Sequence, residues 1–142
     1  MAQFLLSVYE SLRGNYAAAR DALELSDELG GLGLGPVWEP VTIYILGRMG
    51  QADAARRRFE SFVESADSGS YLDAIPATQW MLAYIGIGGQ AEALRWLQIL
   101  ADSPGPYANF IMLANVARNQ LAEPILDQPE FTEARRAIGF PE

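Results

Sequence analysis

Apolar side chains return every three or four positions along most of the chain, which is the period of an amphipathic α-helix. The pattern is clearest over residues 52–66, whose apolar positions are Ala52, Ala55, Phe59, Phe62, Val63 and Ala66. The charged residues of this stretch fall between them. The same period predicts helices over residues 2–13, 16–28, 37–49, 77–84, 91–101 and 107–118, and a short closing helix through Phe131, Ala134 and Ile138. The pattern therefore predicts an all-α chain.

The breaks between these stretches carry glycine and proline. Gly14, Gly50 and Gly88 each end a predicted helix, because glycine tolerates the left-handed conformation that follows a helix. Residues 29–36 contain four glycines and a closing proline, which predicts a longer linker. A phosphate-binding loop is the alternative there, but no strand precedes it and the Gly-Lys-Ser/Thr ending is missing.

Several helix starts and faces follow from single residues. Asp73 is expected to cap a helix that has Pro76 in its first turn, and Asp127 to cap the closing helix. Leu25 falls on the apolar face of residues 16–28, so we expect it to be buried. Trp96 and Ile99 fall outside the apolar face of residues 91–101, so we expect both to add apolar surface.

The glycines also mark an internal repeat. An alanine follows each of them by five residues, at Ala19, Ala55 and Ala93. The spacing from Gly14 to Gly50 is 36 residues, and the spacing from Gly50 to Gly88 is 38. We interpret these stretches as three copies of one helix–turn–helix hairpin. A side chain larger than alanine at the repeated position would push the paired helices apart.

This arrangement resembles the tetratricopeptide repeat (TPR), whose period is about 34 residues. The resemblance implies a right-handed superhelical solenoid of about three hairpins with a divergent C-terminal cap. Residues 1–142 would form one domain, with repeats over about 2–29, 37–66 and 75–102 and the cap over 106–140. The ending from Asn119 through Phe131 to Gly139 and Phe140 is similar to carboxyl-terminal TPR regions attached to bacterial nucleotide cyclases and winged-helix transcription regulators. It implies that the chain belongs to a larger signalling or regulatory protein.

Members of this family usually bind peptides in a concave groove formed by the first helix of each repeat. Carried over position by position, the resemblance gives the groove residues Phe4, Val8, Tyr44, Arg48, Thr78, Leu82, Asn109 and Leu113. These positions are mainly apolar, and Arg48 is the only cation among them. A clamp for a terminal carboxylate, which uses several cationic residues in the family, is therefore disfavoured. An apolar groove would suit a helix, a second copy of the chain or its own closing helix.

The composition excludes several kinds of chemistry. The chain has no Cys and no His, so disulfides, thiol nucleophiles, Ser-His-Asp arrangements and most zinc sites are ruled out. Its ten basic residues are all Arg, and its net charge of −8 disfavours direct binding to nucleic acid. No apolar run approaches the length of about 20 residues that spans a membrane. We expect no enzyme activity, no cofactor and no metal, and a bacterial, cytoplasmic protein, or a periplasmic one if its parent is membrane-anchored.

Three functions stay open from the sequence. A non-catalytic scaffold that binds a protein or peptide in the groove is the main hypothesis. Self-association into a homodimer is the second, because the ends of a short solenoid and the exposed apolar residues offer surface. A ligand-sensing domain for an attached regulator is the third. An acid–base enzyme is disfavoured, because nearly all carboxylates fall on predicted solvent faces.

Overall fold

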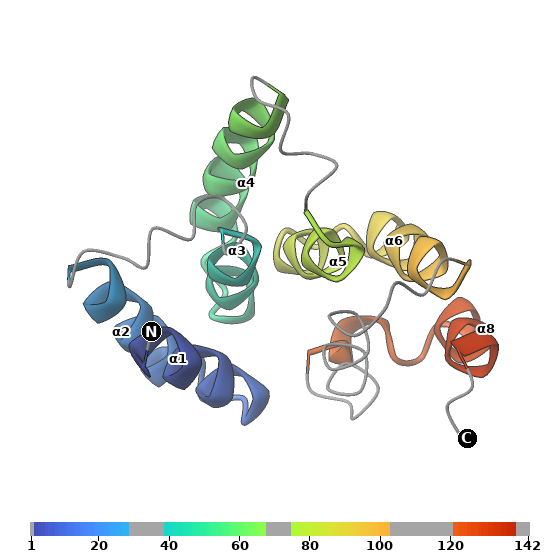
Figure 1. Ribbon diagram of the computed structural model, residues 1–142, viewed down its shortest axis with the longest axis horizontal. Coiled ribbons are helices and arrows are strands. Elements are labelled where there is room, and N and C mark those ends of the chain that lie inside the picture. The colour runs from blue at the N-terminus through green and yellow to red at the C-terminus, as the bar shows by residue number, and fades with distance from the viewer. Residues whose placement is uncertain (1, 29–38, 68–74, 103–120, 139–142) are drawn as a thin grey trace.

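The chain is all-α wherever the computed structural model describes it, which is residues 2–28, 39–67, 75–102 and 121–138 (Figure 1). These ranges contain seven α-helices, one short 3₁₀-helix and no β-strand. The elements are α1 (Ala2–Leu12), α2 (Tyr16–Glu28), α3 (Glu39–Arg48), α4 (Ala52–Asp67), α5 (Ala77–Gly86), α6 (Gln90–Asp102), η3 (Glu123–Ile125) and α8 (Pro129–Ile138). The predicted linker at 29–36, the cap residue Asp73 and the predicted helix at 107–118 lie outside the described residues.

The helices pack mostly against their neighbours in sequence. The pairs α1–α2, α3–α4 and α5–α6 are in contact, and α2–α3, α3–α5 and α4–α5 join one pair to the next. Helix α6 then contacts both η3 and α8. Figure 1 shows the pairs following one another around an arc, from α1 and α2 at the left to α8 at the lower right. The prediction of consecutive helix pairs is confirmed.

The two helices of each pair are joined by a turn of the same type in all three pairs. Gly14, Gly50 and Gly88 have φ values of +76°, +76° and +79°. In the first turn, the Gly14 N–H donates to the Ser11 carbonyl at 3.0 Å and the next N–H, of Asn15, donates to the Glu10 carbonyl at 2.9 Å. The same two bonds, between residues at the same offsets, recur at Gly50 and Gly88. This pattern satisfies the last carbonyls of the first helix, as in a Schellman motif.

The repeated alanines are all fully buried. Ala19, Ala55 and Ala93 are each 0% exposed. Each N–H donates at 3.0 Å to the carbonyl four residues earlier, which is the first residue after the turn glycine. The three alanines are therefore alike in burial and in backbone hydrogen bonding, although Ala19 and Ala93 belong to one core group and Ala55 to another.

Helices α3 and α5 touch through their backbones. A Cβ atom added at Gly47 would lie 1.9 Å from the Gly86 carbonyl oxygen. A Cβ atom added at Gly86 would lie 2.6 Å from the Ile43 carbonyl oxygen. Real Cβ atoms do not approach backbone atoms this closely, so only glycine fits at both positions. These two glycines fix the distance between the second and third helix pairs.

Two groups of buried apolar side chains form the core. The first runs through all the helix pairs to the C-terminal segment and includes Leu23, Tyr44, Met81, Leu97, Ile125 and Phe131. The second is formed mainly by side chains of α3, α4 and α5, including Ile43, Phe62 and Trp80, and Trp96 of α6 packs against it. The Trp80 ring stacks on Trp96 with centroids 5.5 Å apart and 12° between planes, and it lies 5.1 Å from Phe62. Aromatic packing therefore joins the second and third pairs on this side.

Several predictions about single residues were wrong. Trp96 is half-buried against Trp80, because the stack reaches around the side of α6. Leu25 is 40% exposed, although it falls on the predicted apolar face of α2. Pro76 occupies the N-cap position of α5 and not its first turn. Helix α8 begins at Pro129, so the residue before it is Gln128 and not Asp127.

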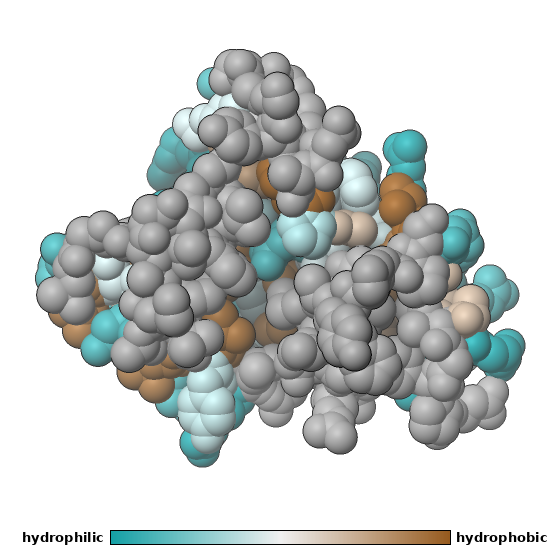
Figure 2. Space-filling view, viewed as in Figure 1, coloured by the Kyte–Doolittle hydropathy of each residue, from teal (hydrophilic) through white to brown (hydrophobic). Residues whose placement is uncertain are grey.

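Exposed apolar surface gathers on the first pair. Leu6 and Tyr9 of α1 are 44% and 52% exposed, and Leu25 lies on α2 of the same pair. Figure 2 shows hydrophobic surface over this pair at the lower left. Ile99 of α6 is also 40% exposed, as predicted.

Candidate functional site

The predicted groove residues fall into two groups in the structure. Tyr44, Thr78 and Leu82 are 1%, 1% and 2% exposed, so they are core residues that a bound peptide would not reach. Val8 is half-buried and packs against the first core group. The Phe4 side chain and the whole of Asn109 and Leu113 lie outside the described residues.

Arg48 is the predicted groove residue that joins other polar groups. Its side chain is 23% exposed, and its Nη2 pairs with the carboxylate of Glu123. Its Nε–H donates to the Tyr16 hydroxyl at 3.1 Å, and its guanidinium carbon lies 5.3 Å from the centroid of the Tyr16 ring. The Tyr16 ring in turn meets Tyr44 edge-on at 6.2 Å. We call Tyr16, Tyr44, Arg48 and Glu123 the Arg48 cluster.

The helix ends explain why this cluster forms. Arg48 is the last residue of α3, Tyr16 is the first residue of α2, and Glu123 is the first residue of η3. Each therefore lies beside a turn. The Gln90 side-chain amide, at the start of α6, donates to the Pro124 carbonyl at 3.1 Å. The turns of the helix pairs and η3 thus lie on the same side of the molecule.

The electrostatics of the cluster favour binding over proton transfer. Burial, helped by the hydrogen bond with Tyr16, raises the pKa of Tyr44, so this phenol stays neutral. Burial lowers the pKa of Arg48, but its hydrogen bonds with Tyr16 and Glu123 outweigh burial and leave it raised. The cluster therefore presents a permanent cation with a carboxylate partner.

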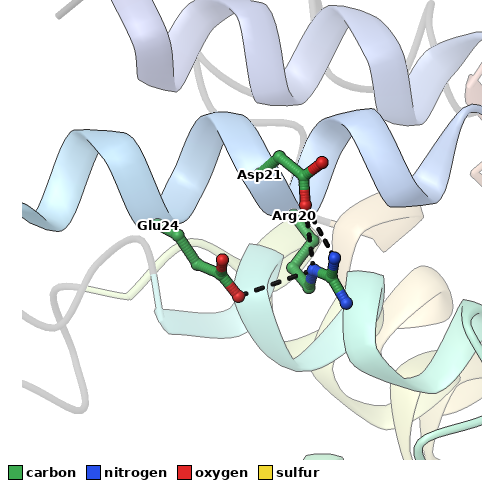
Figure 3. Close-up of polar contacts among 3 residues, drawn as sticks. All are labelled: Arg20, Asp21 and Glu24. Carbon is green, nitrogen blue, oxygen red and sulfur yellow. Dashed lines mark hydrogen bonds and ion pairs between the residues drawn. The ribbon is translucent and has the colours of Figure 1, made fainter.

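A second arginine, on α2, has a different setting. Arg20 contacts Asp21 at 2.7 Å and Glu24 at 3.5 Å, and all three belong to the same helix (Figure 3). The hydrogen bond and charge of Asp21 raise the pKa of Arg20. These side chains are 37% to 66% exposed. Unlike Arg48, Arg20 joins no separate elements, and we assign it to the solvated face of α2.

A hollow of about 440 Å³ lies between α4 and the turn that joins α5 to α6. Its apolar side chains are Phe59, Tyr84 and Ile87, and its charged side chains are Arg56, Glu60 and Glu92. The sequence pattern placed Phe59 on the apolar face of residues 52–66 and charged residues such as Arg56 and Glu60 between the apolar positions. The pattern did not indicate that these side chains line one hollow together with residues of the α5–α6 turn.

A second hollow, of about 580 Å³, lies between α6 and the start of α8. Its lining is mainly amide and charged side chains, among them Gln90, Arg95, Gln98 and Glu130. The described residues contain no group of three or more acidic side chains able to hold a metal ion. Within the same ranges, no helix is both long and apolar enough to cross a membrane.

Comparison of the chain with known protein families, with curated proteins and with solved structures finds no match.

Proposed function

We propose that the chain is a non-catalytic protein-interaction module of the TPR type, in which the helix pairs stack as a solenoid. The observation that carries this proposal is the threefold recurrence of one turn and one buried alanine. Repeated hairpins of this kind bury a continuous core by stacking on their neighbours, and stacked repeats present extended surfaces to partners. The all-Arg basic residues and the net charge of −8 fit a protein partner better than nucleic acid.

The partner surface that we propose is centred on Arg48. Because Tyr44, Thr78 and Leu82 are buried, Arg48 and Val8 are the described groove residues with accessible surface. Arg48 offers a fixed cation beside the Tyr16 ring, a combination that recognises carboxylates and apolar groups together. The kind of parent protein is proposed only from the resemblance to the TPR regions of nucleotide cyclases and transcription regulators. That resemblance does not name the partner.

The test compares partner capture by two charge-reversed chains. Arg48→Glu should lose a partner that the native chain captures from its source cell, while Arg20→Glu should retain it. Arg20 is the matched control because it is also paired with carboxylates but stands on the solvated face of α2. Binding of the identified partner is then measured by calorimetry with all three chains. Equal affinity for all three would contradict the proposed surface.

Self-association is a second candidate, favoured by the exposed Leu6, Tyr9 and Leu25 of the first helix pair. Apolar residues grouped on one pair are a common feature of protein interfaces. Light scattering over a range of concentrations tests this directly. We expect a concentration-dependent dimer that Leu6→Glu disrupts, and a monomer at every concentration would exclude it.

A further inference from the structure

The hollow beside the α5–α6 turn combines an aromatic floor with acidic walls. The rings of Phe59 and Tyr84 lie with centroids 5.0 Å apart and 59° between planes. Both side chains are half-buried, so part of each ring remains accessible. The volume of about 440 Å³ falls within the range of known small-ligand sites. We call this hollow, defined by Phe59, Glu60, Tyr84 and Glu92, the aromatic–acidic pocket.

The aromatic rings of the pocket pack against side chains of the second core group. Tyr84 lies 6.4 Å from Trp80, which stacks on Trp96 and packs against Phe62. These rings come from α4, α5 and α6. The floor is therefore preorganised, which lowers the entropy cost of binding.

The acidic walls come from two different elements. Glu60 lies on α4 and Glu92 on the first turn of α6, and both are exposed. A Cβ atom added at Gly89 would lie 3.2 Å from Glu92 Oε2 and 3.1 Å from Tyr84 Cδ1. The Glu92 carboxylate thus lies over Gly89, close to the Tyr84 ring. With Arg56 as the remaining charged lining residue, the pocket has a net charge of about −1 at neutral pH.

We propose that the aromatic–acidic pocket receives an arginine side chain from a partner protein. A planar guanidinium stacks on aromatic faces and pairs with carboxylates, and both kinds of group line this one hollow. The charge of the ligand also complements the net charge of −8 on the chain. This inference rests on the proposed protein-binding function and names the chemistry of the partner at a surface distinct from Arg48.

The experiment titrates the isotopically labelled full chain with three blocked tripeptides and follows amide chemical shifts. The peptides are Gly-Arg-Gly, Gly-Lys-Gly and Gly-citrulline-Gly, because citrulline keeps the shape of arginine without its charge. We expect saturable shifts at Tyr84, Gly88 and Gly89 with the arginine peptide. The citrulline peptide should give none, and the lysine peptide should bind about fivefold more weakly.

Three variants assign the binding to the pocket. Glu60→Gln and Glu92→Gln should each weaken the arginine peptide about fivefold, as expected for the loss of about 1 kcal/mol. Arg56→Gln should strengthen it, because the variant removes the positive charge of the lining. Glu64→Gln is the matched control, since Glu64 is exposed on α4 and outside the pocket lining.

Several results would overturn the proposal. They are the absence of saturable shifts, equal binding of the lysine peptide, equal binding of the citrulline peptide, or equal weakening by Glu64→Gln. Any of them leaves the Arg48→Glu comparison untouched, because that comparison measures a different surface with a different partner group. Loss of binding in all variants at once, with altered shifts throughout the chain, would contradict the assignment to one pocket.

Discussion

The first and third helix pairs have the same turn but very different surroundings. Seven residues before each turn glycine stand Ser7, Ile43 and Met81, and all three are 0% exposed. In α5, eight of ten residues are buried, so nearly the whole helix is core. In α1, Leu6 and Tyr9 are exposed while Ser7 and Ser11 are buried. The same turn is therefore found beside exposed apolar side chains in the described part of α1 and beside an almost fully buried helix in α5.

The difference shows that the conformation of the turn depends on the residues of the turn itself, whereas the burial of a helix depends on how many other helices pack against it. Helix α5 contacts α3, α4 and α6, whereas the main contact of α1 among the described helices is α2. Ser11 satisfies its buried hydroxyl within α1, by donating to the Ser7 carbonyl at 2.8 Å. Substitutions at the turn glycines should therefore lower the free energy of unfolding by the same amount in both pairs. Substitutions of side chains that pack against neighbouring helices should lower it by different amounts.

The largest effect is expected where the third pair meets the second. Gly47→Ala places a methyl group against the Gly86 backbone, so α3 and α5 must separate. We expect the free energy of unfolding to fall by more than about 3 kcal/mol, measured by urea denaturation. Gly89→Ala is the control, since its methyl group would lie 3.1 Å from Tyr84 Cδ1 and 3.2 Å from Glu92 Oε2, which are side-chain contacts and far looser than the backbone contact at Gly47. Equal losses for the two variants would contradict the backbone contact.

Truncation of core and edge side chains compares the two pairs directly. Met81→Ala leaves a cavity in the first core group and should cost about 2 to 5 kcal/mol. Leu6→Ala removes a side chain that is 44% exposed and should change stability by less than about 0.5 kcal/mol. Thermal and urea unfolding measure both. A cost for Leu6→Ala close to that of Met81→Ala would show that the first pair is as enclosed as the third.

The turn glycines should behave alike in every pair. A Cβ atom at Gly14, Gly50 or Gly88 meets nothing within 4 Å, so the cost of alanine comes from the positive φ alone. We expect about 1 to 2 kcal/mol for each Gly→Ala substitution, and less for Gly→Asn, which accepts this conformation better. A large difference between Gly14→Ala and Gly88→Ala would contradict the local origin of the turn.

High pH should weaken the fold through Tyr44, which joins the first two pairs. Because its pKa is raised by burial, the folded chain keeps this phenol protonated where the unfolded chain ionises it. Its contribution is present below the unfolded pKa of about 10 and is lost above it, by up to about 1.4 kcal/mol per pH unit. The pH dependence of unfolding between 9 and 11 should flatten in Tyr44→Phe. The same comparison at pH 8 serves as the control.

The smallest effect is expected for the ion pair between Arg48 and Glu123. Glu123 is 58% exposed, so solvent screens the pair, and a double-mutant cycle with Arg48→Gln and Glu123→Gln should give a coupling of about 0 to 1 kcal/mol. Added salt should reduce it. The same cycle at Arg20 and Asp21 is the reference, and a coupling above about 2 kcal/mol at Arg48 would show that the pair is enclosed.

Among the described residues, local signals in the sequence were enough to predict the α-helices, the glycine turns and the helix pairs. The turns at Gly14, Gly50 and Gly88 are closed by hydrogen bonds within residues 9–15, 45–51 and 83–89, and Ala19, Ala55 and Ala93 recur at a fixed offset from them. The helix pattern failed where a third element decides burial. Leu25 is exposed because a helix face need not be covered along its whole length, and Trp96 is packed because Trp80 reaches it from α5.

The candidate sites depend on contacts that no local pattern reports. Arg48 and Glu123 stand 75 residues apart, and nothing in either segment indicates the other. Arg48 was singled out by its place in the repeat, whereas Tyr16 was not among the predicted groove residues. The contact of Gly47 with Gly86 was not predicted, because a helical glycine has no sequence signal for its partner. The contacts between segments far apart in the sequence are therefore the features that the sequence alone did not predict.

Because of the glycine contact between α3 and α5, the interfaces between successive helix pairs should differ in stiffness. Backbone atoms in direct contact leave no soft side chain to deform, so the second and third helix pairs should tilt and turn as a single stiff body. The first pair meets α3 partly through the long, flexible side chain of Arg48 against Tyr16. Bending of the arc should therefore concentrate between α2 and α3.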